Sequence, residues 1–135
     1  MPVFGKDHAP TIKEIRQLTA DARLTTHVLD TAAGRAAAGM RVVLWRLDGG
    51  ETRVAEGRTN ADGRFDQPLL EGLTFAPGTY RLDFYVGEYF RANGVALADP
   101  AFLDVVPVRF GIAERTHYHV PLLVAPYGYS TYRGS

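Results

Sequence analysis

Short runs in which apolar and polar residues alternate dominate the chain from residue 24 onward. In residues 80–86, large apolar side chains take every second position, and Arg81, Asp83 and Tyr85 fill the positions between them. Residues 106–110 repeat the pattern. Because successive side chains of a β-strand point to opposite faces, this two-residue period predicts strands with one buried face. Pro107 has no amide hydrogen, so we expect its strand to lie at a sheet edge.

Turn-forming residues separate these runs where hairpins would reverse the chain. Residues 40–47 and 52–59 flank the sequence Asp-Gly-Gly, and residues 60–63, Asn-Ala-Asp-Gly, form another turn cluster. Two last strands, at residues 117–124 and 127–132, are joined through Ala-Pro. About seven or eight strands at this spacing predict an all-β fold, a β-sandwich of two sheets.

Two segments depart from the strand pattern. Residues 87–94, GEYFRANG, are bracketed by glycines and predict one short helix of about two turns. Near the start, residues 11–14 have the form of a capping box, and apolar residues recur at helical spacing as far as Leu18. We therefore expect residues 1–22 to be an N-terminal leader, helical in part, ahead of a single domain at residues 23–135. A leader that packs loosely is the alternative.

The composition narrows the class of protein. The 135 residues suffice for one domain, and 15 Lys and Arg balance 15 Asp and Glu. Nucleic acid is not an expected partner, because phosphate binding needs a surplus of positive charge. No run approaches the roughly 18 apolar residues of a membrane helix, and the start has no apolar stretch of signal-peptide length. The absence of cysteine fits a reducing compartment, so we expect a cytoplasmic protein.

Three histidines are the strongest candidates for chemistry. His117 and His119 lie two residues apart on a predicted strand, so both imidazoles project from the same face. Imidazole is the natural proton carrier at neutral pH, whereas Val or Ile would pack better in a plain strand. Two alternatives stay open here: a pair of surface histidines, or a zinc site with His27 as third ligand. His27, within the apolar run at residues 24–30, could equally be a core or edge histidine.

A polar and aromatic cluster, YRGS at residues 132–135, closes the sequence. Chain ends usually fray, so this composition predicts that the last strand is held in place. Gly134 would permit a close backbone approach, and Ser135 would offer its hydroxyl and a terminal carboxylate. Arg64 follows the turn at residues 60–63, where it could also be a solvated surface charge.

Four segments together resemble the 5-hydroxyisourate hydrolases, also called transthyretin-related proteins. They are LTTHVLD at residues 24–30, DGR at 62–64, GEYF at 87–90, and HYHVPLL continuing through YGYSTYRGS at 117–135. The likeness extends over about residues 23–135, and YRGS is its most specific part because the transthyretins lack it. Two departures, Ala36 where a proline is common and the N-terminal leader, touch none of these motifs.

The resemblance implies a transthyretin-like β-sandwich that assembles as a homotetramer, a dimer of dimers, with active sites in a channel between the dimers. It implies hydrolysis of 5-hydroxyisourate, the product of urate oxidase, to 2-oxo-4-hydroxy-4-carboxy-5-ureidoimidazoline, with no metal and no cofactor. Carried over position by position, it assigns catalytic roles to His27, Arg64, His119 and Ser135. It assigns substrate binding to His117, Tyr132, Arg133 and Gly134.

These residue types suit the opening of a ring amide by water. A base must take a proton from water and an acid must protonate the departing nitrogen; we expect His119 and His27 to position and deprotonate that water. Arg64 and Arg133 would hold the ring and stabilise the oxyanion. The alternative is a transthyretin-like carrier that binds a small molecule without catalysis. A carrier channel would present aliphatic and small side chains where this chain has ionisable ones.

Overall fold

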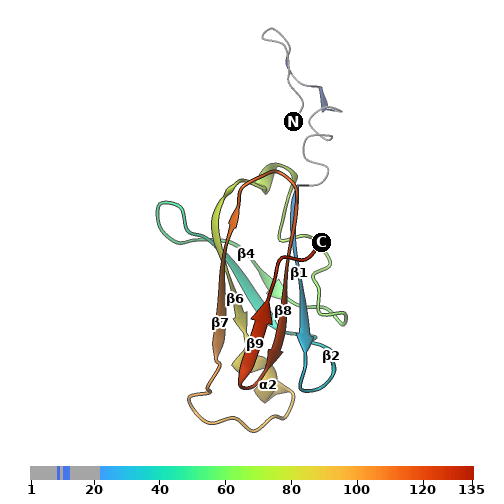
Figure 1. The fold of residues 1–135 in the computed structure, drawn as a ribbon, viewed down its shortest axis with the longest axis vertical. Helices are drawn as coiled ribbons and strands as arrows, with labels where there is room; N and C mark the ends of the chain where they lie inside the picture. The colour runs from blue at the N-terminus through green and yellow to red at the C-terminus, as the bar shows by residue number, and fades with distance from the viewer. Residues whose placement is uncertain (1–8, 10, 13–21) are drawn as a thin grey trace.

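The computed structural model, which describes residues 9, 11, 12 and 22–135, folds into two β-sheets with one helix at one end (Figure 1). In chain order the described elements are β1 (Arg23–Asp30), β2 (Arg35–Ala36), β3 (Arg41–Arg46), β4 (Thr52–Arg58), β5 (Leu70–Glu71), the 3-10 helix η1 (Gly72–Thr74), β6 (Gly78–Tyr85), α2 (Val86–Ala92), β7 (Val105–Ile112), β8 (His117–Ala125) and β9 (Gly128–Thr131). The expected sandwich is confirmed, and the two-residue strands β2 and β5 are additions to it. The expected leader helix lies outside the described residues.

One sheet has the strand order β2-β1-β8-β9, with β5 also paired to β1, and the other has the order β4-β3-β6-β7. The hairpins predicted at residues 48–50 and at residues 125–126 are both present, as β3–β4 and β8–β9. Pro107 lies on β7 at the edge of the four-stranded sheet, as predicted. The short helix predicted at residues 87–94 is α2. Strands β1 and β8 run parallel, a pairing that turn signals alone do not predict.

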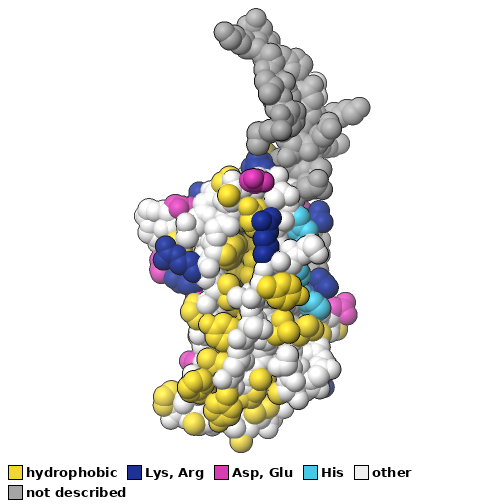
Figure 2. All heavy atoms as spheres, viewed as in Figure 1, with side chains coloured by type: hydrophobic (Ala, Val, Ile, Leu, Met, Phe, Trp, Pro, Cys, Tyr) yellow, Lys and Arg dark blue, Asp and Glu magenta, His cyan; other side chains and the backbone are white. Residues whose placement is uncertain are grey.

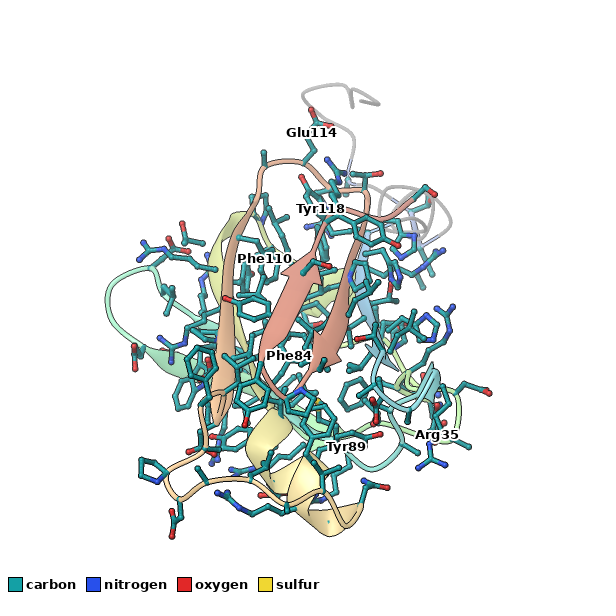
Figure 3. The ribbon with its side chains drawn as sticks, turned by 60° about the horizontal axis from the view of Figure 1, so that its bottom comes forward. Arg35, Phe84, Tyr89, Phe110, Glu114 and Tyr118 are labelled. Carbon is teal, nitrogen blue, oxygen red and sulfur yellow. The ribbon has the colours of Figure 1, made fainter. Side chains whose placement is uncertain are left out.

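The core lies between the two sheets and is built from the alternating positions. Strand β1 buries every second residue from Leu24 to Asp30, and β6 buries Tyr80, Leu82 and Phe84 in the same way. Figure 3 shows Phe84 in the interior, between the sheets. Full burial of one such side chain stabilises the fold by about 1.5–3 kcal/mol. The opposite face of β1 therefore remains available for a site.

One buried hydrogen bond fixes α2 to the sandwich. The Tyr89 hydroxyl donates to Asp30 Oδ2 over 2.8 Å, and Asp30 Oδ1 accepts from the amides of Ala32 and Ala33. Figure 3 shows Tyr89 reaching from the helix toward the end of β1, on the side where Arg35 of β2 lies. Burial first, and then the hydrogen bond to Asp30, raise the pKa of Tyr89 to about 12, so the phenol stays a donor. Two of the motif segments, LTTHVLD and GEYF, thus meet in a structural contact.

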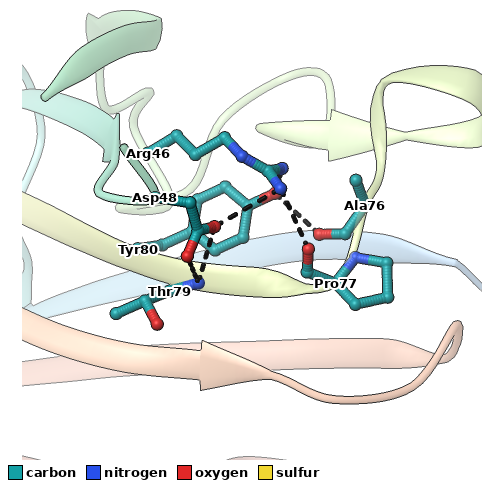
Figure 4. Close-up of polar contacts among 6 residues, drawn as sticks. All are labelled: Arg46, Asp48, Ala76, Pro77, Thr79 and Tyr80. Atoms are coloured by element: carbon teal, nitrogen blue, oxygen red, sulfur yellow. Dashed lines mark hydrogen bonds and ion pairs between the residues drawn. The ribbon is translucent and has the colours of Figure 1, made fainter. Parts of the chain in front are cut away.

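Arg46 ties the β3–β4 hairpin to the start of β6 (Figure 4). Its guanidinium donates to the Tyr80 hydroxyl over 2.8 Å and to the Pro77 carbonyl over 3.1 Å, and it lies 3.3 Å from the Asp48 carboxylate. Asp48 in turn accepts from the Thr79 amide. The charged groups of Arg46 and Asp48 bind each other and their neighbours in this cluster, so we assign the cluster a role in stability rather than in catalysis.

Candidate active site

A cavity of about 300 Å³ lies where β1, β8 and the segment after β4 meet. Four of the residues singled out in the sequence line it: Arg64, His117, His119 and Ser135. Figure 2 shows histidine and Lys or Arg side chains gathered on the same flank of the molecule. The cavity is therefore polar and basic, as expected of a site for an electron-rich, planar ligand.

The parallel register of β1 and β8 explains why these side chains converge. Arg23 pairs with His117, and Thr25 pairs with His119. Neighbouring strands of a sheet lie about 4.8 Å apart, so the paired residues are close together. In both strands these residues are half-buried and alternate with buried core residues, so they share the face away from the core. His27 occupies the next rung of β1. It does not line the cavity, although it is close enough to act on His119 electrostatically.

Thr25 links the two cavity histidines. Its Oγ1 lies 2.7 Å from His117 Nε2 and 2.8 Å from His119 Nδ1, both within hydrogen-bonding range. The two imidazole centroids are 6.1 Å apart. The rings are therefore connected through the hydroxyl.

Arg64 is held at the cavity by its backbone. Its amide donates to Asn60 Oδ1, and its carbonyl accepts from the Asn60 amide over 2.7 Å. The Gly63 carbonyl accepts from the Val28 amide of β1 over 2.8 Å. Gly63 has φ +75°, and a Cβ there would collide with the Val28 carbonyl oxygen. The Asp-Gly-Arg motif is thus a turn that docks on β1 and delivers the guanidinium to the site.

The segment after β9 returns to His119. Strand β9 pairs Thr131 with Leu122, and the same register brings Gly134 opposite His119, where its amide donates to the His119 carbonyl over 2.8 Å. Pro121 interrupts the ladder between these points because it has no N–H. A Cβ on Gly134 would lie 2.5 Å from His119 Cδ2. Glycine is therefore required for the imidazole to pack against this backbone.

The environment of His119 favours its neutral form. Burial, and then the positive charges of Arg64, His117 and His27, lower the pKa of His119 below its ordinary value of 6.5. A neutral imidazole at pH 7 can accept a proton, which is the property that a general base needs.

Tyr132 and Arg133 lie elsewhere. They line a second cavity of about 370 Å³ between β7 and the β8–β9 hairpin, and the Arg133 guanidinium carbon lies 4.1 Å from the centre of the Tyr118 ring. Side chains alternate between faces along an extended segment, so Arg133 points away from the side on which Gly134 meets His119. Within one chain, the structure does not bring these two predicted residues into the histidine cavity.

Several cavity residues were not predicted from the sequence, among them Arg23, Thr25 and Gln67. Thr25 stands two residues before His27 on a predicted strand, so its position on the same face was available as a signal. Its contact with the β8 histidines depends on the parallel β1–β8 pairing, which the sequence did not reveal. Gln67 follows no motif.

The alternative of a zinc site with His27, His117 and His119 as ligands is not supported by the arrangement of these side chains. Among residues 9, 11, 12 and 22–135, no group of three or more His, Cys, Asp or Glu side chains is placed to hold a metal ion.

Fold and cavity together define a transthyretin-like β-sandwich with an ionisable site on the β1–β8 face. The model of the HIUase/Transthyretin family matches residues 24–134. The chain belongs to this family.

Individual relatives share both the sequence and the fold. The protein named 5-hydroxyisourate hydrolase 2 of Rhizobium meliloti (strain 1021) is 62% identical over 115 residues, which cover 84% of this chain and 96% of that protein. The crystal structure of an (S)-allantoin synthase superposes with a TM-score of 0.79 at 48% identity; the match covers 87% of this chain and 46% of that one, so this chain spans about half of it. Sea bream transthyretin, solved in complex with thyroxine, gives a TM-score of 0.74 at 28% identity, covering 83% of this chain and 94% of its own.

Proposed function

We propose that this chain hydrolyses 5-hydroxyisourate to 2-oxo-4-hydroxy-4-carboxy-5-ureidoimidazoline in urate degradation. The observation that carries the proposal is a half-buried histidine with a lowered pKa, His119, in one cavity with Arg64 and Ser135. The 62% identical relative with that name supports the same substrate.

In the proposed reaction, neutral His119 takes a proton from water as the water oxygen bonds to the ring carbonyl carbon. The carbonyl electron pair moves to oxygen, where the Arg64 guanidinium stabilises the negative charge. When the pair returns, the ring C–N bond breaks and protonated His119 gives its proton to the departing nitrogen. No metal or organic cofactor is needed for these steps.

The remaining predicted residues take supporting roles in this proposal. His27 acts on His119 electrostatically from the next rung of β1, and Ser135 and His117 orient the ring at the cavity wall. Gly134 acts by leaving room for the His119 imidazole. Substrate binding by Tyr132 and Arg133 requires that assembly with other copies bring them to a histidine cavity.

The proposed assembly is the homotetramer, a dimer of dimers. Support comes from exposed aromatic surface: Phe102 is 72% exposed and Tyr127 is 73% exposed, and their ring centroids are 5.8 Å apart. Figure 2 shows apolar side chains spread over the lower end of the molecule, the end at which α2 lies in Figure 1. Contiguous apolar surface of this kind marks association sites.

We also propose a cytoplasmic location, with residues 1–22 as a leader to the catalytic domain at residues 23–135. In the part of the chain that the structure describes, no helix is long and apolar enough to cross a membrane. The lack of cysteine agrees with a reducing compartment.

A carrier without catalysis is the second candidate, because the transthyretin relative was solved with thyroxine. The test is to generate 5-hydroxyisourate with urate oxidase and to follow its decay with and without this protein. We expect the decay to accelerate in proportion to added protein. A carrier would bind the compound and leave its decay unchanged.

A further inference from the structure

We propose that Thr25 is a positioning residue that joins His117 and His119 through its hydroxyl, so that the two imidazoles share a proton and act as one acid–base unit. This inference rests on the proposed hydrolysis for its catalytic meaning. Its structural part, the coupling between the two rings, stands on the geometry alone.

A threonine hydroxyl has one proton, and this limits the directions of the two hydrogen bonds that Thr25 Oγ1 can make to the imidazoles. The hydroxyl can donate to only one imidazole nitrogen at a time, while both lie within 2.7–2.8 Å of Oγ1. When both rings are neutral and both bonds are made, one ring nitrogen therefore accepts from Oγ1–H, and the other donates its own N–H to Oγ1. The tautomer of His117 thus fixes the tautomer of His119.

Two chains of hydrogen bonds satisfy this condition. In the first, His119 Nδ1–H donates to Oγ1, and Oγ1–H donates to His117 Nε2, which leaves the lone pair on His119 Nε2. This is the form of His119 that can take a proton from water. In the second, the direction is reversed, and His119 holds its proton on Nε2. This is the form that can return a proton to the leaving nitrogen.

Catalysis converts the first chain into the second. As His119 Nε2 binds the water proton, its Nδ1 proton passes to Oγ1, and the Oγ1 proton passes to His117 Nε2. The net result is one O–H bond broken in water and one N–H bond formed on His119 Nε2. One N–H bond is also broken on His119 Nδ1 and one is formed on His117 Nε2, so the positive charge resides on His117. Return of the Nε2 proton to the leaving nitrogen runs the chain backward and restores the starting state.

The charged neighbours of His119 explain why moving the positive charge to His117 would be favourable. His119 is faced by Arg64 from the segment after β4, by His117 on β8 and by His27 on β1, and Arg23 and Ser135 also line the cavity. A positive charge confined to His119 would lie beside the Arg64 guanidinium in a half-buried site. Burial, and then Arg64 and the neighbouring histidines, lower the pKa of His119, in keeping with a ring that needs help to hold a proton. Sharing the charge with His117 supplies that help.

The fold holds the hydroxyl in place. Thr25 pairs with His119 across the β1–β8 ladder, and its branched Cβ restricts χ1. Thr25 is half-buried and lines the same cavity as both rings. A valine would keep the shape of the side chain and remove only the hydrogen-bonding group.

The test compares three variants with the wild-type protein. Thr25→Val removes the hydroxyl, Thr25→Ser retains it, and Thr31→Val is the matched control. Thr31 follows β1 and donates to the Val124 carbonyl of β8 over 3.2 Å, so its replacement removes a hydroxyl from the same strand junction outside the cavity. The measurements are kcat and KM for 5-hydroxyisourate across pH, and ¹⁵N NMR titration of the histidine side chains in the free protein.

In Thr25→Val we expect kcat to fall about 10- to 100-fold with KM changed by less than about threefold, and the acid limb of the pH profile to move. Thr25→Ser should recover most of the rate, and Thr31→Val should match the wild type. In the wild type, the NMR signals of His117 Nε2 and His119 Nδ1 should titrate together as a coupled pair, and Thr25→Val should separate them.

The inference is overturned if Thr25→Val retains the wild-type kcat and pH profile, or if Thr25→Ser is as impaired as Thr25→Val. Independent titration of the two rings in the wild type would also overturn it, whether or not the variants fold. Failure of the proposed function looks different: the wild type would not accelerate the decay of 5-hydroxyisourate, while the NMR titration would still decide whether the rings are coupled.

Discussion

His119 draws its chemical character from neighbours contributed by three separate segments. β1 supplies Thr25, the turn after β4 supplies Arg64, and the segment after β9 supplies the Gly134 backbone that the imidazole packs against. None of these groups is near His119 in the sequence. The reactivity of a single residue is therefore a property of how distant segments are brought together.

Replacing His119 by alanine tests its role as the base. We expect His119→Ala to lower kcat/KM about 10²-fold or more, the usual scale for a lost acid–base group. In the wild type, kcat/KM should fall as pH drops through the lowered pKa of His119, with a midpoint below pH 6.5. A steady-state pH series on both proteins measures this, and a wild-type acid limb above pH 6.5 would contradict the assignment.

The same lowered pKa affects stability in a defined direction. The folded state binds fewer protons at His119 than the unfolded state between the folded pKa and 6.5. The contribution of His119 to stability is therefore fully present above pH 6.5 and is lost as the pH falls through the folded pKa.

Gly134 provides a test of imidazole placement without a change of charge. A methyl group there would lie 2.5 Å from His119 Cδ2, so Gly134→Ala should displace the ring and lower kcat about 10-fold or more. Gly128→Ala on β9 is the control, because a Cβ at Gly128 meets no atom within 4 Å. Equal activity of the two variants would show that the ring does not depend on this contact.

At the scale of elements, periodicity predicted the strands, hairpins and helix, because burial of one strand face imposes a two-residue repeat on the sequence. It could not predict that β1 and β8 lie side by side and parallel, because that pairing depends on how the whole chain packs. The grouping of His117, His119 and Arg64 therefore came from family resemblance, and the part played by Thr25 required the structure. The position of Arg133 followed the same alternation, which sets it on the face opposite Gly134.

The attachment of α2 gives a prediction at this scale. Tyr89→Phe removes a hydrogen bond to the buried Asp30 carboxylate, and it should lower the free energy of unfolding by about 1–3 kcal/mol. Urea unfolding measures this. Tyr127→Phe is the control, because Tyr127 is 73% exposed. An unchanged midpoint for Tyr89→Phe would mean that Asp30 is satisfied by the amides of Ala32 and Ala33.

At the scale of the whole molecule, the core between the sheets is buried, whereas sheet edges and aromatic side chains on the outside are left uncovered. The strands β7 and β9 lie at sheet edges, and the second cavity opens between β7 and the β8–β9 hairpin. Phe102 before β7, Tyr127 in the β8–β9 turn and Tyr129 on β9 are exposed aromatic residues. These features support the proposed assembly, in which further copies would cover the exposed surface.

Phe102 is the residue with which to test that assembly. It is 72% exposed, so Phe102→Ser should leave the fold of one chain intact and weaken association about 10-fold or more through lost apolar burial. Sedimentation velocity across a concentration series measures the change. Leu73→Ser, at an 87% exposed position on η1, is the control and should assemble as the wild type does. A wild type that sediments as a single chain at all concentrations would refute the tetramer.

The ladder between β8 and the segment after β9 is interrupted at Pro121, so the number of residues between Thr131 and Gly134 decides which residue meets His119. Gly134 meets His119 because the residues after Thr131 keep the β9 register past Pro121. One residue inserted after Tyr132 would preserve every amino acid of the motif and present Arg133 to the imidazole in place of Gly134. The length of this segment is therefore constrained as strictly as the glycine at position 134, because a shift of one residue would place a side chain against the His119 imidazole.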